Sequence, residues 1–516
     1  MPLTLTYAQA LWRRAERAPR SELLRIVGGD PWTADDVRTR AASWAICLAP
    51  VGPDDVVVTC VDSGPNAVAL TAAISALGAV ELPLGADTPV EWACELVELT
   101  RARLVVSSAS RTEPPLVRRL VHATTDRRLE LIEDPGTFEP HLPGADHVVP
   151  IARSTTDPAT VVVTSGTTGR QKAALLPVGA PIRQARQVAA AMQYGSDDVL
   201  LSLFPWHHIN ARNAVVLPAI LSGARVVFTP HFSASRFWEL VRREHVTAFT
   251  FMGAVCMMLL RQPPSGDDRR HPLTKAYGGP APADLVADFA DRFGVTLRQA
   301  YACTELGDIS TTALDELCPG AAGRPVDDRE IRIVDEQLRP VPDGATGEIL
   351  VRPRDPGTTL LEYVGDPQAT AAAWESGWFR TRDRGRLDAG WLHITGRASD
   401  VIRRRGTNID PAQIEEALLA HPEVAEAAAI AVPSELTEDE VLAIVVPTAT
   451  KSPSPETLWK HCEQLLPRFA VPRYLTVRQS VPHTMTHKLD RALLRRRGLP
   501  ADAWDAETRS LTPEPR

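Results

Sequence analysis

One stretch of the chain has the residue types of an anion-binding loop. The apolar, β-branched run Val161–Val163 predicts a buried strand that ends in residues rich in hydroxyl groups and glycine. Glycine lets the backbone approach a bound group closely, hydroxyl groups donate hydrogen bonds, and Lys172 adds a positive charge just beyond. These features suit a polyphosphate. We call the stretch the phosphate loop, and its members are Thr164, Ser165, Gly166, Thr167, Thr168 and Gly169.

The phosphate loop differs from the usual nucleotide-binding loop. The pattern G-x-x-x-x-G-K-[ST] requires adjacent glycine and lysine, whereas Arg170 and Gln171 separate Gly169 from Lys172. Taken by itself, the stretch could also be a hairpin turn rich in serine and threonine. Other parts of the chain have to decide between these interpretations.

Four further stretches match motifs of one family, in the same order along the chain. They are Tyr301–Glu305, Trp378–Asp383, Gly396–Glu415 and Pro482–Arg491. With the phosphate loop they make the chain similar to the adenylate-forming enzymes, the superfamily of acyl-CoA synthetases, peptide-synthetase adenylation domains and luciferases. The resemblance covers nearly the whole sequence, and five motifs in register make coincidence improbable.

The resemblance implies that the protein joins a carboxylate to the α-phosphate of ATP and expels pyrophosphate. Catalysis of such a step is mainly positioning and stabilisation of negative charge on the phosphoryl oxygens. The phosphate loop would hold the leaving β- and γ-phosphates, with Thr164 and Lys172 as catalytic residues. Glu305, next to Thr304, would hold Mg²⁺, a hard cation that prefers oxygen ligands.

The same resemblance assigns the nucleotide contacts. Tyr301 would lie against the adenine, and Gly278 and Gly279 would line its pocket through their backbone. Asp383 would accept hydrogen bonds from both ribose hydroxyls, because an ionised carboxylate offers two acceptor oxygens. Arg397 would bind ribose or phosphate.

Lys488 would be the adenylation lysine, in contact with both the substrate carboxylate and the α-phosphate. The chain has 56 lysines and arginines, of which five are lysines, so a lysine among Arg491, Arg495 and Arg496 is conspicuous. A compact, flexible ammonium has properties that the planar guanidinium lacks. On a C-terminal domain that turns about the hinge residues Ser399 and Asp400, Lys488 could enter for adenylation and withdraw afterwards.

Four positions depart from the family's motifs. Ala302, Arg382 and His487 stand where relatives have glycine, and Ser399 replaces the charged hinge residue of most relatives. A Cβ at 302 or 487 restricts the backbone, and Ser399 lacks a charge that could bias domain rotation. These departures bear on thioester formation more than on adenylation.

Candidate substrate-binding residues lie mainly after the predicted strand Val199–Phe204. His208 matches the acyl-pocket histidine of CoA ligases, and residues 205–213 contain no acidic side chain to pair with an α-ammonium, which disfavours amino acids. The sequence as a whole is similar to those of crotonobetaine/carnitine-type CoA ligases. The other predicted pocket residues are Trp206, Asn210, Met252, Gly278, Cys303 and Leu306.

We therefore expect an ATP- and Mg²⁺-dependent enzyme that forms an acyl-AMP and passes the acyl group to CoA. One alternative acceptor is the phosphopantetheine thiol of a carrier protein. Another is an amine, with activation of an unusual acid such as nitrite. A non-catalytic nucleotide-binding scaffold is the alternative from another class, but the presence of Glu305 and Lys488 argues against it.

The elements that position these residues are predicted to form an α/β fold. Short buried strands such as Val56–Cys60 alternate with helices such as Asn66–Leu77, as in layers with a parallel sheet. Beyond Gly320, short strands and turns predict a β-rich subdomain. We expect a large multi-layer N-terminal core over residues 1–395 and a hinge segment over 396–405.

Residues 406–516 are predicted to form a small, mobile α+β lid domain. Helices at Pro411–Ala420 and Pro455–Leu466 alternate there with strands, among them Ala425–Val432 and Val441–Val446. The tail from Asp502, rich in proline, glutamate and threonine, is expected to be frayed.

Composition excludes several classes of protein. At 516 residues, with 44% hydrophobic and 23% charged residues, the chain is an ordinary globular protein of two or more domains. A net charge of −8 and the lack of a basic stripe disfavour nucleic acid and membrane partners. Seven scattered cysteines and no apolar signal-peptide core at the N-terminus favour a cytoplasmic protein, as monomer or homodimer.

Overall fold

The structure of the protein, a computed structural model, covers most of the sequence. It describes residues 5–49, 51–85, 88–108, 120, 130–134, 142–164, 172–397, 400, 402–404, 407–434, 439–448, 452–483, 489–508 and 510–511. Residue contacts divide the chain into two compact units, which are considered separately. Unit 1 contains the residues up to Ile331, except 167–170, together with Val351–Phe379. Unit 2 contains residues 167–170, Arg332–Leu350 and the chain from Arg380 onward.

The first sheet of unit 1 contains the strand that leads to the phosphate loop. Among the described residues its strand order is β18-β8-β7-β4-β3-β5-β6, in which β3 to β7 are parallel and β8 is antiparallel to β7. Its elements are β3 (Val56–Cys60), α3 (Pro65–Ala76), β4 (Val80–Pro83), α4 (Val90–Thr100), β5 (Leu104–Ser108), β6 (Glu130–Asp134), β7 (Pro158–Thr164), β8 (Lys172–Pro177) and β18 (Glu362–Tyr363).

The second sheet of unit 1 is also largely parallel. Its order is β15-β14-β13-β12-β11-β9-β10-β1-β2, with β14 antiparallel to β13. The strands are β1 (Glu22–Ile26), β2 (Trp32–Thr33), β9 (Val199–Ser202), β10 (Arg225–Phe228), β11 (Ala248–Phe251), β12 (Lys275–Gly278), β13 (Leu297–Cys303), β14 (Gly307–Thr311) and β15 (Arg324–Pro325). The helices between them are α1 (Tyr7–Arg17), α2 (Ala34–Cys47), α6 (Gly179–Ala191), η3 (Asn210–Val216), α7 (Leu217–Ser222), α8 (Phe237–Arg243), α9 (Gly253–Leu260) and α10 (Ala283–Phe293).

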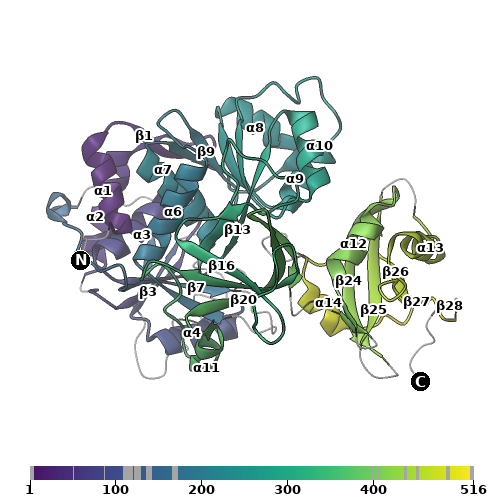
Figure 1. Ribbon diagram of the computed structural model, residues 1–516. Coiled ribbons are helices and arrows are strands. Elements are labelled where there is room, and N and C mark those ends of the chain that lie inside the picture. Colours follow the sequence, from purple (N-terminus) through teal and green to yellow (C-terminus); the bar gives the residue numbers. More distant parts are fainter. Residues whose placement is uncertain are drawn as a thin grey trace. The chain divides into compact units, whose positions relative to one another are not determined.

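Helices cover both faces of the second sheet, as Figure 1 shows. Alternate residues of a strand point to opposite faces, so Leu200 and Leu201 of β9 belong to different hydrophobic clusters. The cluster around Leu200 includes α1, α2, α3, α6 and α7, and it also contains Val57 of the first sheet. These helices are therefore packed between the two sheets. The prediction of a multi-layer α/β domain is confirmed.

A third sheet matches the predicted β-rich segment. Its order is β16-β17-β20-β19, with β21 paired to β20. The strands are β16 (Arg329–Val334), β17 (Gly347–Pro353), β19 (Trp374–Glu375), β20 (Trp378–Asp388) and β21 (Trp391–Arg397), and α11 (Pro367–Ala372) precedes β19.

Unit 2 ends in a compact α+β fold. Its five-stranded sheet has the order β24-β25-β26-β27-β28, and β25 packs Val441, Ala443 and Val445 on one face and Leu442 and Ile444 on the other. Helices α12 and α13 cover the first face and α14 the second. The elements are β22 (Ile402–Arg404), β23 (Thr407–Ile409), α12 (Pro411–Leu419), β24 (Val424–Pro433), β25 (Asp439–Pro447), α13 (Pro455–Leu465), β26 (Tyr474–Val477), α14 (Arg491–Arg497), β27 (Trp504–Asp505) and β28 (Ser510–Leu511).

The expectation of a frayed tail from Asp502 is wrong for the residues that form β27. Trp504 and Asp505 are buried, and β27 pairs with β26. Arg473 donates to both carboxylate oxygens of Asp505, at 3.2 and 3.1 Å. The polar composition of the segment concealed one large aromatic side chain and one ion pair, which together fix it to the sheet.

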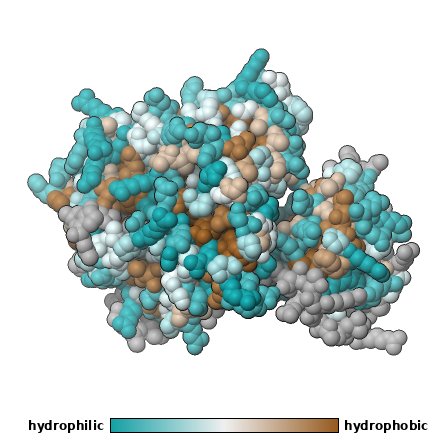
Figure 2. All heavy atoms as spheres, in the orientation of Figure 1, coloured by the Kyte–Doolittle hydropathy of each residue, from teal (hydrophilic) through white to brown (hydrophobic). Residues whose placement is uncertain are grey.

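The surface and the cysteines agree with the composition. Figure 2 shows hydrophilic residues interspersed with smaller hydrophobic areas on the visible face. Within the part of the chain that the structure describes, no helix has both the length and the hydrophobicity of a membrane span. All seven cysteines lie in the described part, and none of them forms a disulfide there.

One ion pair is buried between the first sheet and η3. Arg212 donates to Glu81, and both side chains are almost inaccessible to solvent, with 7% and 3% exposed. Thr59 and Thr71 donate their hydroxyl groups to the other carboxylate oxygen of Glu81, at 2.8 and 3.1 Å. Each charge therefore depends on the other for compensation, because desolvation of an unpaired charge is costly.

Replacement of Glu81 by glutamine should destabilise unit 1 by about 3 kcal/mol, because it leaves the Arg212 guanidinium buried without a counter-charge. Urea unfolding of Glu81→Gln, Arg212→Met and the double variant would measure this. We expect the double variant to be more stable than the sum of the single losses implies. Strictly additive losses would contradict the coupling of the two side chains.

Candidate active site

The phosphate loop connects two antiparallel strands. Thr164, at the end of β7, is paired with Lys172, at the start of β8, and the Thr164 hydroxyl donates to the Lys172 carbonyl at 3.4 Å. The predicted strand Val161–Val163 lies within β7. The chain thus reverses direction here, unlike the strand-loop-helix unit of the usual nucleotide loop. The loop members Ser165, Gly166, Thr167, Thr168 and Gly169 lie outside the described residues.

Glu305 lies in a three-residue turn between two antiparallel strands. Cys303, the last residue of β13, pairs with Gly307, the first of β14, so that Thr304, Glu305 and Leu306 form the turn. The segment that leads into β18 of the first sheet forms a hydrogen bond with this turn. The backbone N–H of Leu360 donates to the Glu305 carbonyl at 2.7 Å.

Tyr363 of β18 connects Glu305 to Lys172. Its hydroxyl donates to the Glu305 carboxylate at 2.7 Å, and the Lys172 ammonium lies 4.7 Å from the centre of its ring. Burial, reinforced by the negative charge of Glu305, raises the pKa of Tyr363 far above its usual value, so the phenol remains a proton donor. We call these three residues the Lys–Tyr–Glu cluster. Sequence reasoning missed Tyr363, because no local pattern indicates a contact 58 residues away.

Buried charges behind the turn fix its backbone. The Leu306 carbonyl accepts from Arg329 at 2.9 Å and from Arg183 at 3.4 Å, and Arg183 also donates to the Asp308 carbonyl at 2.6 Å. Asp328 accepts from both arginines, at 2.7 Å from Arg183 and 3.0 Å from Arg329. The side chain of Leu306 is fully buried, so the structure gives no support for its predicted place in the substrate pocket.

A carboxylate is buried beside this network. Asp308 accepts from the Tyr277 hydroxyl at 2.6 Å and from the Gln184 amide at 3.1 Å. Its complete burial raises its pKa above the usual value, although the two donors and Arg183 oppose that change. The amide of Asn213 in turn donates to Gln184 at 3.1 Å. The network therefore extends from the turn to η3.

Four adjacent parallel strands bring several predicted site residues to one edge of the second sheet. His208 follows β9, Met252 follows β11, Gly278 ends β12 and Cys303 ends β13, and these strands are neighbours in that order. Ligands of open α/β sheets bind at the carboxyl ends of the strands. The carboxyl ends of these four strands are consequently the best candidate for the acyl and adenine pocket.

Close backbone approach explains the two glycines of this edge. A Cβ on Gly278 would lie 1.9 Å from the Phe251 carbonyl oxygen. Gly279 has φ of +151°, and a Cβ there would lie 3.1 Å from the Ala300 carbonyl oxygen, next to Tyr301. Tyr301 itself is half-buried. The predicted adenine-pocket residues thus lie on neighbouring strands.

The predicted acyl-pocket residues differ in their exposure. His208 is half-buried, and its ring lies 4.7 Å from that of His207. The Asn210 side chain accepts from the Thr250 hydroxyl at 2.7 Å. Trp206, in contrast, is buried and donates its indole N–H to Thr71 at 3.2 Å, so it supports the core instead of facing a substrate.

The predicted ribose ligands lie in unit 2. Asp383 of β20 is paired with Arg397 of β21, and the side chain of Arg397 is outside the described residues. Arg382, which replaces a family glycine, has φ of +62°, in the left-handed region that favours glycine. Ala302, the other described departure, requires no such conformation.

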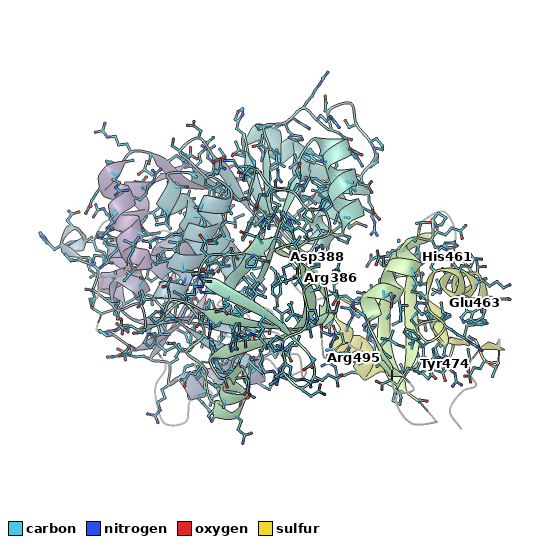
Figure 3. All side chains as sticks on the ribbon, viewed as in Figure 1. Arg386, Asp388, His461, Glu463, Tyr474 and Arg495 are labelled. Atoms are coloured by element: carbon cyan, nitrogen blue, oxygen red, sulfur yellow. The ribbon has the colours of Figure 1, made fainter. Side chains whose placement is uncertain are left out.

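Asp400, a predicted hinge residue, is held by the helix that follows the predicted catalytic lysine. Arg495 donates to its carboxylate at 2.8 Å, and Arg491 donates to Glu415 of α12 at 2.7 Å. Figure 3 labels Arg495 on α14. Burial raises the pKa of Glu415 above its usual value. Ser399 and Lys488 lie outside the described residues.

The residues present fit a magnesium site of the kind that phosphate substrates complete. Among the described residues, no group of three or more histidine, cysteine, aspartate or glutamate side chains could hold a metal ion by itself. Mg²⁺, however, is commonly bound through one or two carboxylates plus substrate phosphates. Glu305, held on one side by Tyr363, can supply such a carboxylate.

Comparison with known proteins gives a consistent result. The family of AMP-binding enzymes matches residues 11–359, and the C-terminal domain of AMP-binding enzymes matches residues 413–488. A crotonobetaine/carnitine–CoA ligase of Escherichia coli is 28% identical over 457 residues, which is 86% of this chain and 88% of that protein. The Escherichia fergusonii ligase of the same name is 31% identical over 348 residues, 66% of this chain and 67% of that protein.

Solved structures show the same fold. ATP-bound MatB from Rhodopseudomonas palustris is similar with a TM-score of 0.86 at 22% identity, covering 95% of this chain and 98% of that one. The anthranilate CoA ligase AuaEII in complex with anthranoyl-AMP has a TM-score of 0.85 at 20% identity, covering 97% and 98%.

Tyr363→Phe should weaken Mg²⁺ binding about 10-fold, because residues that orient a metal ligand commonly affect affinity by that factor. The measurement is a Mg²⁺ titration of ATP–pyrophosphate exchange. Tyr474→Phe, a change to a buried tyrosine of β26, is the control and should leave the titration unchanged. If both variants show the same small loss of rate with an unaltered Mg²⁺ midpoint, Tyr363 does not orient Glu305.

Proposed function

The chain belongs to the AMP-binding enzyme family, and from this premise we propose that it is an ATP- and Mg²⁺-dependent acid–CoA ligase. It forms an acyl-AMP and pyrophosphate from a carboxylic acid and ATP, and then transfers the acyl group to CoA. The observation that carries the proposal is the Lys–Tyr–Glu cluster, in which a carboxylate for a metal and an ammonium for a phosphate contact the same phenol.

The proposed first step, adenylation, depends on charged side chains that are already in position before the substrates bind. Glu305 cannot turn freely, because Tyr363 donates to its carboxylate and Leu360 to its carbonyl. Bound Mg²⁺ would neutralise charge that develops on the phosphoryl oxygens. Lys172, with the donors of the phosphate loop, adds positive charge where pyrophosphate leaves. Such preorganised charge requires little rearrangement during the reaction.

The proposed second step uses the smaller unit. Lys488 contacts the carboxylate and the α-phosphate during adenylation and is withdrawn when the C-terminal domain turns about Ser399 and Asp400. Asp383 binds the ribose throughout, and Arg397 binds ribose or phosphate. The ion pair between Asp400 and Arg495 supports this proposal, since it ties the hinge to the helix that follows Lys488.

The acceptor is proposed to be CoA because the curated relatives are named as CoA ligases. A carrier-protein thiol or an amine remains the alternative, motivated by Ser399 and by the departures at 302 and 487. The acid is proposed to be other than an α-amino acid, because residues 205–213 include no carboxylate. We also propose a cytoplasmic location, where ATP and CoA are available and thiols stay reduced.

Exchange of labelled pyrophosphate into ATP across a panel of carboxylic acids tests the first step. Loss of the CoA thiol in the same reactions tests the second. Exchange accompanied by thiol loss supports the proposal. Exchange without thiol loss, but with product formed from an added amine, favours the alternative acceptor. Measurable ATP binding without exchange for any acid would favour a scaffold.

Lys488→Ala should reduce adenylation by at least about 100-fold while thioester formation from supplied acyl-AMP stays near the wild-type rate. The control is Lys460→Ala, because the Lys460 side chain is 61% exposed and forms an ion pair with the neighbouring Glu456 on α13. Both half-reactions should be unchanged in the control. Equal loss of the two half-reactions in Lys488→Ala would contradict domain alternation.

Glu305→Gln should raise the Mg²⁺ concentration that gives half-maximal exchange, because the neutral amide is a poor ligand for a hard cation. We expect a shift of about 10-fold or more. Glu362→Gln is a matched control, since Glu362 is exposed and adjacent to Tyr363 in β18. An identical Mg²⁺ profile for wild type and Glu305→Gln would remove Glu305 from the metal site.

A further inference from the structure

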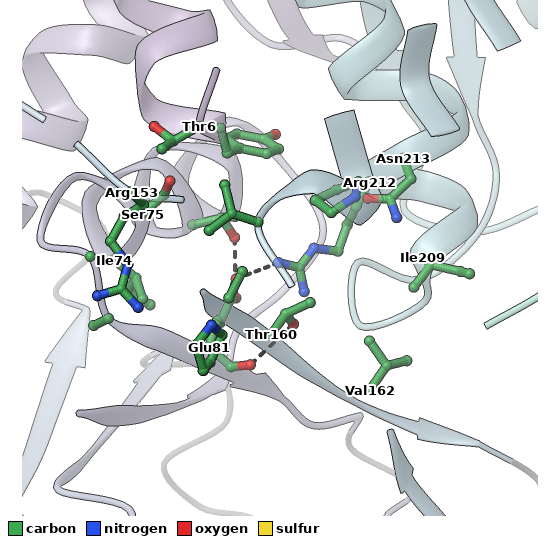
Figure 4. A pocket seen from close by; sticks show the side chains of 18 residues that line it. Thr6, Ile74, Ser75, Glu81, Arg153, Thr160, Val162, Ile209, Arg212 and Asn213 are labelled. Carbon is green, nitrogen blue, oxygen red and sulfur yellow. Dashed lines mark hydrogen bonds and ion pairs between the residues drawn. The ribbon is translucent and has the colours of Figure 1, made fainter. Parts of the chain in front are cut away.

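A cavity inside unit 1 is lined by residues outside the candidate active site. It lies between the start of α1, the end of α3, strands β4 and β7, and η3 (Figure 4). Its volume is about 50 Å³. Because one water molecule needs at least about 10–15 Å³ by the same measure, there is room for about three or four small atoms. The cavity could therefore hold a molecule of the size of acetate.

The lining contains two arginines and one carboxylate. They are Arg153, Arg212 and Glu81. Figure 4 shows the two arginines on opposite sides of Glu81. The carboxylate oxygens of Glu81 already accept hydrogen bonds from Thr59, Thr71 and Arg212.

The polar atoms without a partner are donors. Among the described residues that line the cavity, the Tyr7 hydroxyl and Arg212 Nη1 are buried and make no hydrogen bond. Tyr7 and Arg212 are 7% and 6% exposed, and both line the cavity. Burial raises the pKa of Tyr7 well above its usual value, so its hydroxyl remains protonated. Buried donors of this kind are costly unless an acceptor satisfies them.

We propose that the cavity is a binding site for a small monovalent oxyanion of the carboxylate class, held by the Tyr7 hydroxyl and Arg212 Nη1. Arg153, which forms ion pairs with Asp54 and Asp157, also lines the cavity. A carboxylate suits the site because its two oxygens can accept one hydrogen bond from the Tyr7 hydroxyl and one from Arg212 Nη1. None of the lining residues belongs to the predicted adenylate or metal contacts.

The proposed anion site lies close in sequence to two segments of the candidate active site. Arg212 lies in η3, four residues beyond His208, and Val162 of the lining precedes Thr164 by two residues in β7. An anion that fixes Arg212 and the start of β7 would therefore stabilise two segments that carry candidate catalytic residues. The expected primary effect is greater resistance of unit 1 to unfolding, because the ligand binds the folded state.

Ordered water is the competing occupant, since waters also satisfy buried donors. The two can be separated because water occupancy does not depend on the salt present. Thermal unfolding of the full chain in sodium acetate is compared with unfolding in sodium chloride at the same ionic strength. The tested variant is Tyr7→Phe, and the control is Tyr194→Phe, which changes a buried tyrosine outside the cavity lining.

We expect acetate to raise the unfolding temperature of the wild type and of Tyr194→Phe by about 2 °C or more, and of Tyr7→Phe by less than half as much. A crystal of the wild-type protein soaked in acetate should show a carboxylate within hydrogen-bond distance of Tyr7 and Arg212. Water alone in the cavity, acetate only beside His208, or equal stabilisation of all three proteins would overturn the proposal. The crystal decides the matter if Tyr7→Phe does not fold.

Discussion

The need to compensate buried charge determines where the functional turn of this protein lies. Arg329 is buried and Arg183 half-buried behind Glu305, and the two donate to the carbonyls of Leu306 and Asp308 and to Asp328. Because an unpaired guanidinium in the interior is very unfavourable, the turn cannot shift without losing these bonds. Glu305 is thereby presented from a rigid backbone. Under the proposed function, such rigidity would keep the proposed metal ligand in place before substrates arrive.

Much of the architecture could be predicted from local patterns. The runs Val56–Cys60 and Val161–Val163 lie in observed strands, because β-branched residues between turn signals mark buried strands. Helices α1 and α10 were not predicted, although each has a clear amphipathic pattern. The error at the C-terminus had the opposite cause. The polar composition of the tail predicts fraying, but the burial of one residue, Trp504, fixes β27 to the sheet.

The site was predictable to the extent that residue type reflects chemistry. Glu305, Gly278 and His208 are predicted from their residue types, and the structure places Glu305 on a turn, Gly278 at the end of β12 and His208 in the segment after β9. Tyr363 and the Arg183–Asp328 pair could not be found in this way, because their contacts join segments 58 and 145 residues apart. Trp206 and Leu306 illustrate the reverse problem, since an apolar residue next to a motif can equally belong to the core.

The antiparallel pairing around the phosphate loop has a consequence for how its length can vary. In β8, Lys172 contacts the ring of Tyr363 from one face of the strand, and Thr164 is its fixed partner in β7. A one-residue slip of this register would move every side chain of β8 to the opposite face of the sheet. A loop transplanted from another enzyme therefore has to leave Thr164 paired with Lys172. Any difference in its length must be accommodated between these two residues, so that Lys172 stays over the ring of Tyr363.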